Sequence, residues 1–278
     1  MDRLSTEDLH KTANWYGDYY FAHACGRPYR RDAEWLSFFG AIADRIVSDI
    51  NPRTVLDAGC AMGFLVEALH DRGVDSFGVD ISEYAIQGVR QDVRPNCWVG
   101  KVTDSLPQRY DLVICMEVLE HVPPDESEQA VENLCRYTDD ILFSSTPFDY
   151  KEATHLNVQP PEYWGELFAR HRFFRDVDFD ASFITPWAAR FRHRREPLHR
   201  IVREYERRFW LLWKENTDLR AAALEMHDQL ATSELVTATA AAQEARDAEI
   251  AHLRDLVAGY ERGFFISVMR KLRRILGV

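Results

Sequence analysis

The sequence predicts an α/β fold, in which an open, doubly wound and mostly parallel sheet is followed by a long C-terminal helical extension. Short apolar runs alternate with amphipathic helical patterns between residues 34 and 145, and this alternation is typical of strand–helix–strand crossovers. The runs are apolar on both faces, as parallel strands covered by helices on either side are. From Ile201 the chain has no proline and no glycine before Gly259, which indicates a continuous helix.

Local patterns define each element. Trp35, Phe39 and Ile42 lie at helical spacing in the first predicted helix, and Asn51-Pro52 ends it. The predicted helices are 34–50, 63–72, 83–91, 125–136 and 160–171. The predicted strands are 54–58, 76–79, 97–99, 110–115 and 140–144. Two further runs, 173–179 and 188–193, are predicted to be strands of an antiparallel edge.

Composition indicates two regions with different partners. Residues 1–189 carry 17 basic and 32 acidic side chains, whereas residues 190–278 carry 17 and 13. An acidic first region argues against nucleic acid as a ligand, because phosphate binding needs basic surface. The five cysteines form no CxxC pair, so we expect reduced thiols in a cytoplasmic protein. The N-terminus has no signal-peptide core, and no apolar run is long enough to span a membrane.

The strongest motif is VLDAGCAMG at residues 55–63, where a buried strand enters a glycine turn that opens a helix. Gly59 and Gly63 allow the backbone to approach a ligand closely, and the helix start offers unpaired N–H groups. The spacing is DxGxxxG, which differs from the GxGxxG of dinucleotide sites. The carboxylate of Asp57 would repel a phosphate but attract a cationic amino group.

Two further motifs end strands at the same edge of the sheet. Asp80, in GVDIS, follows the next strand and can accept hydrogen bonds from ribose hydroxyls, or can serve only as a helix cap or turn residue. YDLVICMEVLEHV, at residues 110–122, ends an apolar strand in a carboxylate-rich loop. Because ligands bind at the carboxyl ends of the strands in doubly wound sheets, we expect all three motifs to line one crevice.

Together these three motifs resemble the class I S-adenosylmethionine-dependent methyltransferases over roughly residues 34–195. The resemblance implies a Rossmann-like sheet of seven strands, one of them antiparallel, and S-adenosylmethionine as the cofactor. It implies that Asp57, Gly59 and Gly63 border the methionine moiety. The implied cofactor-binding residues are Asp57, Gly59, Cys60, Ala61, Gly63, Asp80, Ile81, Asp104, Met116, Glu117 and Tyr16. The sequence departs from the family after the third strand, where Lys101 stands near the expected adenine-binding acid and Asp104 follows three residues later.

The densely aromatic stretch 15–21 is the core of a predicted lid segment, 1–33. Aromatic faces can stack on a sulfonium as they do on other cations. We expect Tyr16, Tyr19 or Tyr29 to touch the cofactor. The alternative is a lid that only packs its rings on the domain.

A hydroxyl acceptor would benefit from a base, and His121 and His155 are the candidates near the crevice. Each has a structural alternative: holding a loop for His155, and a helix start for His121. The segment His155-Leu156-Asn157, followed by Tyr163-Trp164, resembles methyltransferases encoded with bacterial surface-polysaccharide glycosyltransferases. That resemblance implies a sugar or glycan acceptor. No His, Asp or Glu spacing predicts a metal site.

The predicted domains after the lid are a methyltransferase domain, 34–198, a coiled-coil helix, 199–262, and a basic amphipathic helix, 263–278. Ile250, Leu253 and Val257 begin a 3-4-3-4 seam that continues through Tyr260 and Phe264 and predicts a homo-oligomer. The alternative is a long solvated helix packed on its own domain. The last helix can lie in an anionic membrane interface, at the inner face of the membrane, or dock on a partner.

These observations favour O-methylation of a sugar in a bacterial surface glycan or its precursor. A second hypothesis is methylation of a soluble small molecule, with the tail serving only oligomerisation. A third is a scaffold or chain-length-measuring protein that uses the coiled coil.

Overall fold

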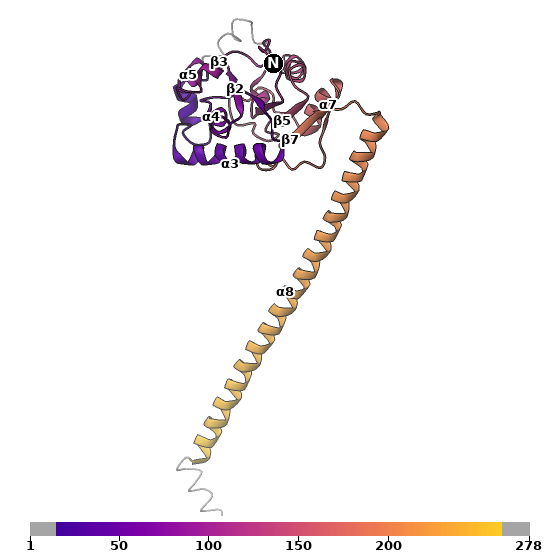
Figure 1. The fold of residues 1–278 in the computed structure, drawn as a ribbon. Helices are drawn as coiled ribbons and strands as arrows, with labels where there is room; N and C mark the ends of the chain where they lie inside the picture. Colours follow the sequence, from indigo (N-terminus) through magenta and orange to yellow (C-terminus); the bar gives the residue numbers. More distant parts are fainter. Residues whose placement is uncertain (1–14, 263–278) are drawn as a thin grey trace, which may run out of the picture. The chain divides into compact units, whose positions relative to one another are not determined.

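Seven strands form a single sheet in the order β3-β2-β1-β4-β5-β7-β6 (Figure 1). The computed structural model describes residues 15–262, with side chains up to residue 259. The strands are β1 Thr54–Ala58, β2 Asp75–Asp80, β3 Cys97–Val99, β4 Leu112–Met116, β5 Asp140–Ser144, β6 Phe173–Arg175 and β7 Ala189–His193. Only β7 runs antiparallel to its neighbours: β5 and β6 each pair with it in antiparallel register. The predicted seven-stranded, doubly wound α/β fold is therefore confirmed.

Helices lie on both faces of this sheet. The α-helices of the first region are α2 Asp18–His23, α3 Ala33–Asp49, α4 Phe64–His70, α5 Glu83–Gln87, α6 Ser127–Arg136 and α7 Pro161–Arg170, and the 3-10 helices are η2 Arg94–Asn96 and η3 Leu119–His121. Alternate residues of β1 point to opposite sides. Val55 packs with α3 and α4, whereas Leu56 packs with α6 and α7. The crossovers thus bury both faces, as the apolar strands require.

The observed helix ends have local physical causes. Asp32 caps α3 by accepting a hydrogen bond from the Trp35 N–H at 3.1 Å. After α3, Asn51 takes a left-handed conformation with φ 54°, and Pro52 cannot continue the helix. Pro161 occupies the first turn of α7, where its missing N–H is not needed.

Several elements are shorter than the sequence pattern predicts, among them the helix predicted over 63–72, which spans Phe64–His70. The helix predicted over 83–91 ends at Gln87, since a one-turn segment closes at Gly88. The strand predicted over 173–179 ends at Arg175. The Asp176 N–H still donates a hydrogen bond to the Arg190 carbonyl oxygen at 2.7 Å. The Phe179 N–H instead donates to the Asp176 carbonyl oxygen, so the chain forms a turn there and leaves the sheet. The helix predicted from 125 begins at Ser127.

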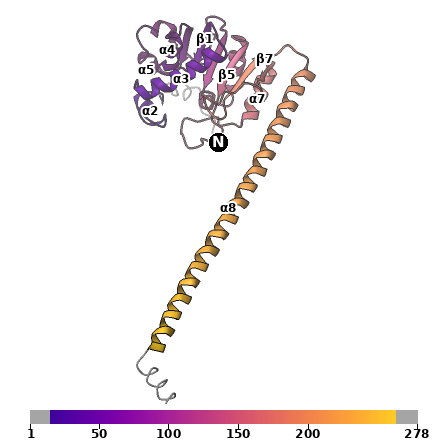
Figure 2. The same ribbon diagram turned by 60° about the horizontal axis from the view of Figure 1, so that its bottom comes forward.

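The chain divides into two compact units, Met1–Arg208 and Phe209–Val278. The continuous helix α8, Leu198–Arg262, supplies the described part of the second unit (Figure 2). Its side chains between 209 and 257 are exposed to solvent. Among the described residues, no helix has the length and apolar character needed to cross a bilayer. The predicted basic amphipathic helix, 263–278, lies outside the described residues.

Candidate active site

A cavity of about 500 Å³ opens at the carboxyl ends of the parallel strands in the first unit. The strand order reverses between β1 and β4, and such a switch point is where doubly wound sheets bind ligands. The turn after β1, the end of β2 and the loop after β4 all contribute to the cavity wall. Among the predicted site residues, those that line it are Tyr16, Asp57, Gly59, Cys60, Ala61, Asp80, Ile81, Met116, Glu117, His121 and His155.

The glycine turn brings backbone close to this cavity. Gly59 has φ 92°, and a Cβ added there would lie only 2.2 Å from Cγ2 of Val118. A larger residue would therefore both strain the backbone and clash with the loop after β4. Ala61 also has a positive φ, 46°, so the turn is held in an unusual conformation by its surroundings.

Asp80 holds this turn in place. One of its carboxylate oxygens accepts a hydrogen bond from the Ala61 N–H at 2.8 Å, and the other accepts from the Ser82 N–H at 2.8 Å. Burial raises the pKa of Asp80, and the two N–H donors oppose that rise. The helix cap of α5 is Ser82 and not Asp80. Asp80 therefore acts as a turn residue and also faces the cavity, so its two sequence interpretations are compatible.

Asp57 faces the same cavity without a partner. Its side chain is 5% exposed and accepts no hydrogen bond from the described residues. Burial, and secondarily the nearby Asp80, raise the pKa of Asp57 to about 7. A buried carboxyl group of this kind is stabilised in its charged form by a cation or a hydrogen-bond donor.

The loop after β4 carries Met116 and Glu117 into the cavity wall. Glu117 has φ 54°, and its carboxylate accepts a hydrogen bond from Nε1 of Trp187 at 2.9 Å. This bond ties the end of β4 to the segment that precedes β7. The strained backbone and the long-range bond together fix where this carboxylate points.

His121 is held against the loop that follows β5. Its Nδ1 lies 3.1 Å from both the carbonyl oxygen and the hydroxyl of Thr154. Its ring meets those of Tyr16 and His155 edge-on, with ring centroids 5.6 and 4.7 Å apart. Burial and the neighbouring His155 lower the pKa of His121 to about 4, so its imidazole is neutral at physiological pH.

His155 lies beside two acids of its own loop. Its Nδ1 is 2.8 Å from the Asp149 carbonyl oxygen, and its Nε2 is 3.3 Å from Oε2 of Glu152. The side chain of His155 is 8% exposed. The loop bond predicted as its structural alternative is therefore present, and the same side chain also faces the cavity.

Glu120 is a site residue that the sequence analysis does not single out. It is completely buried; Oε1 accepts a hydrogen bond from the Thr146 N–H at 3.3 Å, and Oε2 has no partner among the described residues. Burial, and secondarily Glu117, raise its pKa. The sequence signal for it is its place in the EVLEHV segment, directly before His121.

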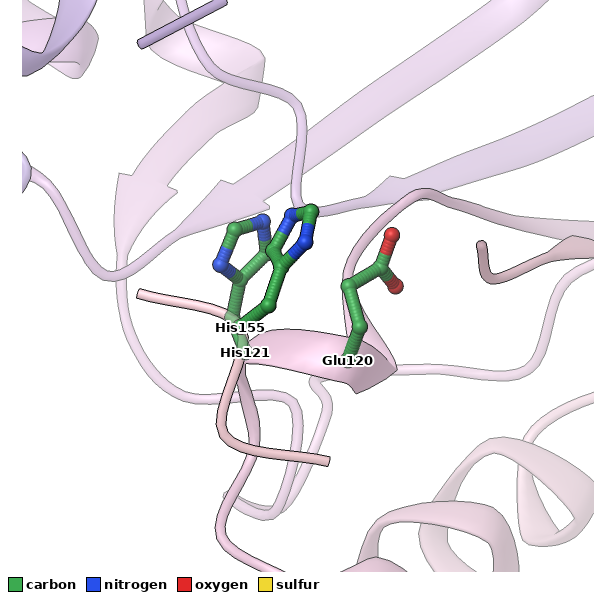
Figure 3. A group of neighbouring side chains, drawn as sticks. All are labelled: Glu120, His121 and His155. Carbon is green, nitrogen blue, oxygen red and sulfur yellow. The ribbon is translucent and has the colours of Figure 1, made fainter. Parts of the chain in front are cut away.

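The structure brings potential metal ligands together although no sequence spacing predicts a metal site. Glu120, His121 and His155 each offer a ligand atom, and these atoms lie within 4.8 Å of one another (Figure 3). Asp149, Glu152 and His155 form a second such group. His155 is 34 positions from His121 in sequence, so spacing alone misses the first group, whereas Asp149, Glu152 and His155 lie within seven residues of one loop.

The aromatic segment is anchored to the end of β2. The Ser82 hydroxyl donates a hydrogen bond to the Tyr16 carbonyl, and the Tyr16 ring packs edge-on against Tyr20 at 4.9 Å. Tyr20 and Tyr29 line the cavity with Tyr16. Tyr19 does not line it; this side chain is 76% exposed and stacks on His23.

Two predicted site residues lie outside the cavity wall. Gly63 begins α4 with φ 70° and faces Val89. Asp104 accepts a hydrogen bond from the Lys101 N–H at 2.8 Å, and so closes the turn whose residues 100–103 do line the cavity. Asp104 thus forms a turn, and Lys101 is the residue of this pair that lines the cavity.

Fold and site together define an α/β domain with a cavity at the switch point of a doubly wound sheet, the place where such sheets bind ligands. Residues 29–177 match the family described as "Methyltransferase domain", and the chain belongs to this family.

The chain is also similar to curated proteins and to a solved structure. The Ubiquinone biosynthesis O-methyltransferase of Methylococcus capsulatus is 32% identical over 142 residues, 48% of this chain and 58% of that protein. Its namesake from Nitrosomonas europaea is 33% identical over 112 residues, 37% of this chain and 47% of that protein. The chain thus spans about half the length of these curated relatives. Magnesium protoporphyrin IX methyltransferase from Synechocystis, solved with bound SAM, is 20% identical with TM-score 0.47, covering 69% of this chain and 97% of that one.

Proposed function

We propose that the chain binds S-adenosylmethionine in this cavity and transfers its methyl group to an oxygen atom of an acceptor. The observation that carries the proposal is the buried Asp57, which has no hydrogen-bond partner among the described residues and lies beside the Gly59 turn at the switch point of the sheet. A cavity of about 500 Å³ is large enough for such a ligand and part of an acceptor. Membership of the methyltransferase-domain family supports the same activity.

The residues fit the groups of this cofactor. Asp57 offers a carboxylate to a cationic amino group, and formation of that ion pair favours the ionised acid. Asp80 keeps acceptor capacity for ribose hydroxyls besides its two backbone bonds. The rings of Tyr16 and Tyr20 cover the cavity, where they exclude water and offer π faces to a sulfonium.

S-adenosylmethionine supplies a methyl group on a positively charged sulfur; the carbon–sulfur bond breaks, its electron pair stays on sulfur, and a carbon–oxygen bond forms. The protein's part is to hold the acceptor oxygen in line and to remove its proton. His121 and His155 line the same cavity as Asp57 and Asp80. In this proposal they are the residues on the acceptor side.

Calorimetry with S-adenosylmethionine tests cofactor binding. In Asp80→Asn, the amide nitrogen cannot accept the Ala61 N–H, so we expect binding to weaken by about 1–3 kcal/mol. The matched control is Asp75→Asn at the opposite end of β2, which should bind like wild type. No heat of binding in the wild-type protein would remove the proposal and leave the scaffold hypothesis.

For the acceptor, we favour a sugar of a bacterial surface glycan or its precursor. Its support is the His155-Leu156-Asn157 segment on the acceptor side and a tail that would keep the enzyme near a membrane-bound glycan. A second candidate is an acceptor of ubiquinone biosynthesis, favoured by the names of the relatives. Methylation of another soluble small molecule is the third.

Mass spectrometry of cells lacking the protein separates these acceptors. A glycan lighter by one methyl group per repeat supports the first, and an accumulated unmethylated quinone precursor supports the second. If neither the glycan mass nor the level of the quinone precursor changes, both of these acceptors are rejected. Co-sedimentation with anionic liposomes, with and without residues 263–278, tests the proposed membrane association of the tail.

A further inference from the structure

Three potential metal ligands from two separate segments meet at the cavity wall. Glu120 and His121 belong to η3, and His155 comes from the loop after β5. In Figure 3 the two imidazole rings lie side by side with the Glu120 carboxylate next to them. Their ligand atoms lie within 4.8 Å of one another. A ligand atom lies about 2.1 Å from the metal ion it binds, so two ligand atoms of one ion are at most about 4.2 Å apart. The distances between these ligand atoms therefore need to shorten only slightly for an ion to bind.

Both histidines hold the same ring nitrogen against a backbone carbonyl. Nδ1 of His121 is 3.1 Å from the Thr154 carbonyl oxygen, and Nδ1 of His155 is 2.8 Å from the Asp149 carbonyl oxygen. The Thr154 hydroxyl, which is also near Nδ1 of His121, donates to Glu152. Because a carbonyl oxygen only accepts hydrogen bonds, these contacts favour the tautomer with the proton on Nδ1. In that tautomer Nε2 offers its lone pair, as it does in many metal-binding histidines.

Glu120 provides an independent sign of a missing partner. It is completely buried. The Ser145 hydroxyl is near enough to lower the pKa of Glu120, but among the described residues neither that hydroxyl nor Oε2 of Glu120 completes a hydrogen bond. Leaving such an oxygen unpaired costs free energy, and an ionised carboxylate costs more. A bound cation would satisfy this oxygen.

Glu152 adds a second carboxylate beside His155. Its Oε2 lies 3.3 Å from Nε2 of His155, and its other oxygen, Oε1, accepts a hydrogen bond from the Thr154 hydroxyl. Carboxylate oxygens beside the ring favour a bound cation at this place.

We propose that Glu120, His121 and His155 bind a divalent first-row transition-metal ion. Two imidazoles and a carboxylate suit Mn²⁺, Fe²⁺ or Zn²⁺ better than Mg²⁺ or Ca²⁺. Because these residues line the cavity, the remaining coordination positions face the ligand side. If the proposed methyltransferase activity holds, the ion would bind the acceptor hydroxyl and lower its pKa, and the histidines would be ligands instead of free bases.

The test uses the full chain, freed of metal with a chelator and titrated with MnCl₂. The electron paramagnetic resonance signal of free Mn²⁺ reports binding, and added Zn²⁺ should displace the bound ion. We expect one ion per chain. Glu120→Gln and His155→Gln should each weaken binding by about tenfold or more. Glu162→Gln, an exposed carboxylate on α7, is the matched control and should bind Mn²⁺ as wild type does.

Failure to bind either Mn²⁺ or Zn²⁺ would overturn the proposal, and so would equal affinity in wild type and both variants. If Glu120→Gln does not fold, His155→Gln still decides, since His155 lies on a loop. Calorimetry with S-adenosylmethionine on the same samples keeps the two proposals apart. If the protein binds the cofactor but no metal ion, only the metal-site proposal is rejected. If it binds the metal ion but not the cofactor, only the proposed methyl donor is rejected.

Discussion

At the residue scale, the buried Asp57 makes stability depend on pH. Burial beside Asp80 raises its pKa to about 7 in the folded protein, whereas an unfolded aspartic acid ionises near pH 4. Between these values the folded state holds a proton that the unfolded state has released. The contribution of Asp57 to stability must therefore fall as pH rises from about 4 to about 7.

We expect Asp57→Asn to remove this dependence. Relative to the variant, wild type should lose up to about 4 kcal/mol of unfolding free energy between pH 4 and 7.5, since one pKa unit corresponds to about 1.4 kcal/mol. Urea denaturation at several pH values measures the difference. Parallel curves for the two proteins would show that Asp57 does not titrate in this range.

The sequence predicts the site residues at the ends of strands but misses the contacts made by an irregular loop. Asp57, Gly59 and Asp80 follow two adjacent strands, so local pattern and sheet topology suffice to predict that they meet. The contact of His121 with Thr154 joins residues 33 positions apart. It depends on the path of an irregular loop, for which no periodic pattern exists, so the metal-binding arrangement was not predictable from spacing.

At the element scale, the antiparallel edge is tied to the parallel part of the sheet by a buried ion pair. Arg190 of β7 donates two hydrogen bonds to Asp140 of β5, one of them from Nε at 2.8 Å. The side chains are only 12% and 14% exposed. The strand pattern predicts both strands, but a pattern of apolar residues carries no information about this charged pair.

We expect Arg190→Met to destabilise the protein by about 3 kcal/mol, because it leaves the Asp140 carboxylate buried without its main partner. Arg192→Met on the same strand is the matched control. Its side chain is 49% exposed, so its loss should cost under about 1 kcal/mol. Chemical denaturation of both variants measures the two changes in unfolding free energy. Equal changes would mean that the buried Arg190–Asp140 pair contributes no more to stability than an exposed arginine does.

At the scale of the whole molecule, helix α8 is a 65-residue element that leaves large apolar side chains in water. Those on its second half include Leu235, Val236, Ile250, Leu253, Leu256 and Val257, all 40% exposed or more. An amphipathic helix normally covers its apolar stripe. Ile250, Leu253 and Val257 border one shallow surface hollow, so the described part of the predicted seam does share a face.

We expect a second copy of the chain to cover this seam. Its apolar residues repeat at the spacing of a coiled coil, and the seam ends in residues of the same chain, Tyr260 and Phe264, that continue the repeat. The wild-type protein should therefore be a dimer or larger oligomer at micromolar concentration in analytical ultracentrifugation. Leu253→Asp places a charge in the seam and should shift the protein toward monomer.

The matched control for this substitution is Ala251→Asp. It introduces the same charge two positions away, close to the opposite side of the helix, so the oligomer should persist. Cofactor binding by the first unit should be unchanged in both variants, which separates loss of association from misfolding. A wild-type protein that sediments as a monomer at all concentrations would contradict the coiled coil, and the apolar face would then need a different partner. Equal dissociation by both substitutions would instead show that charge anywhere on this part of α8, and not the seam, controls association.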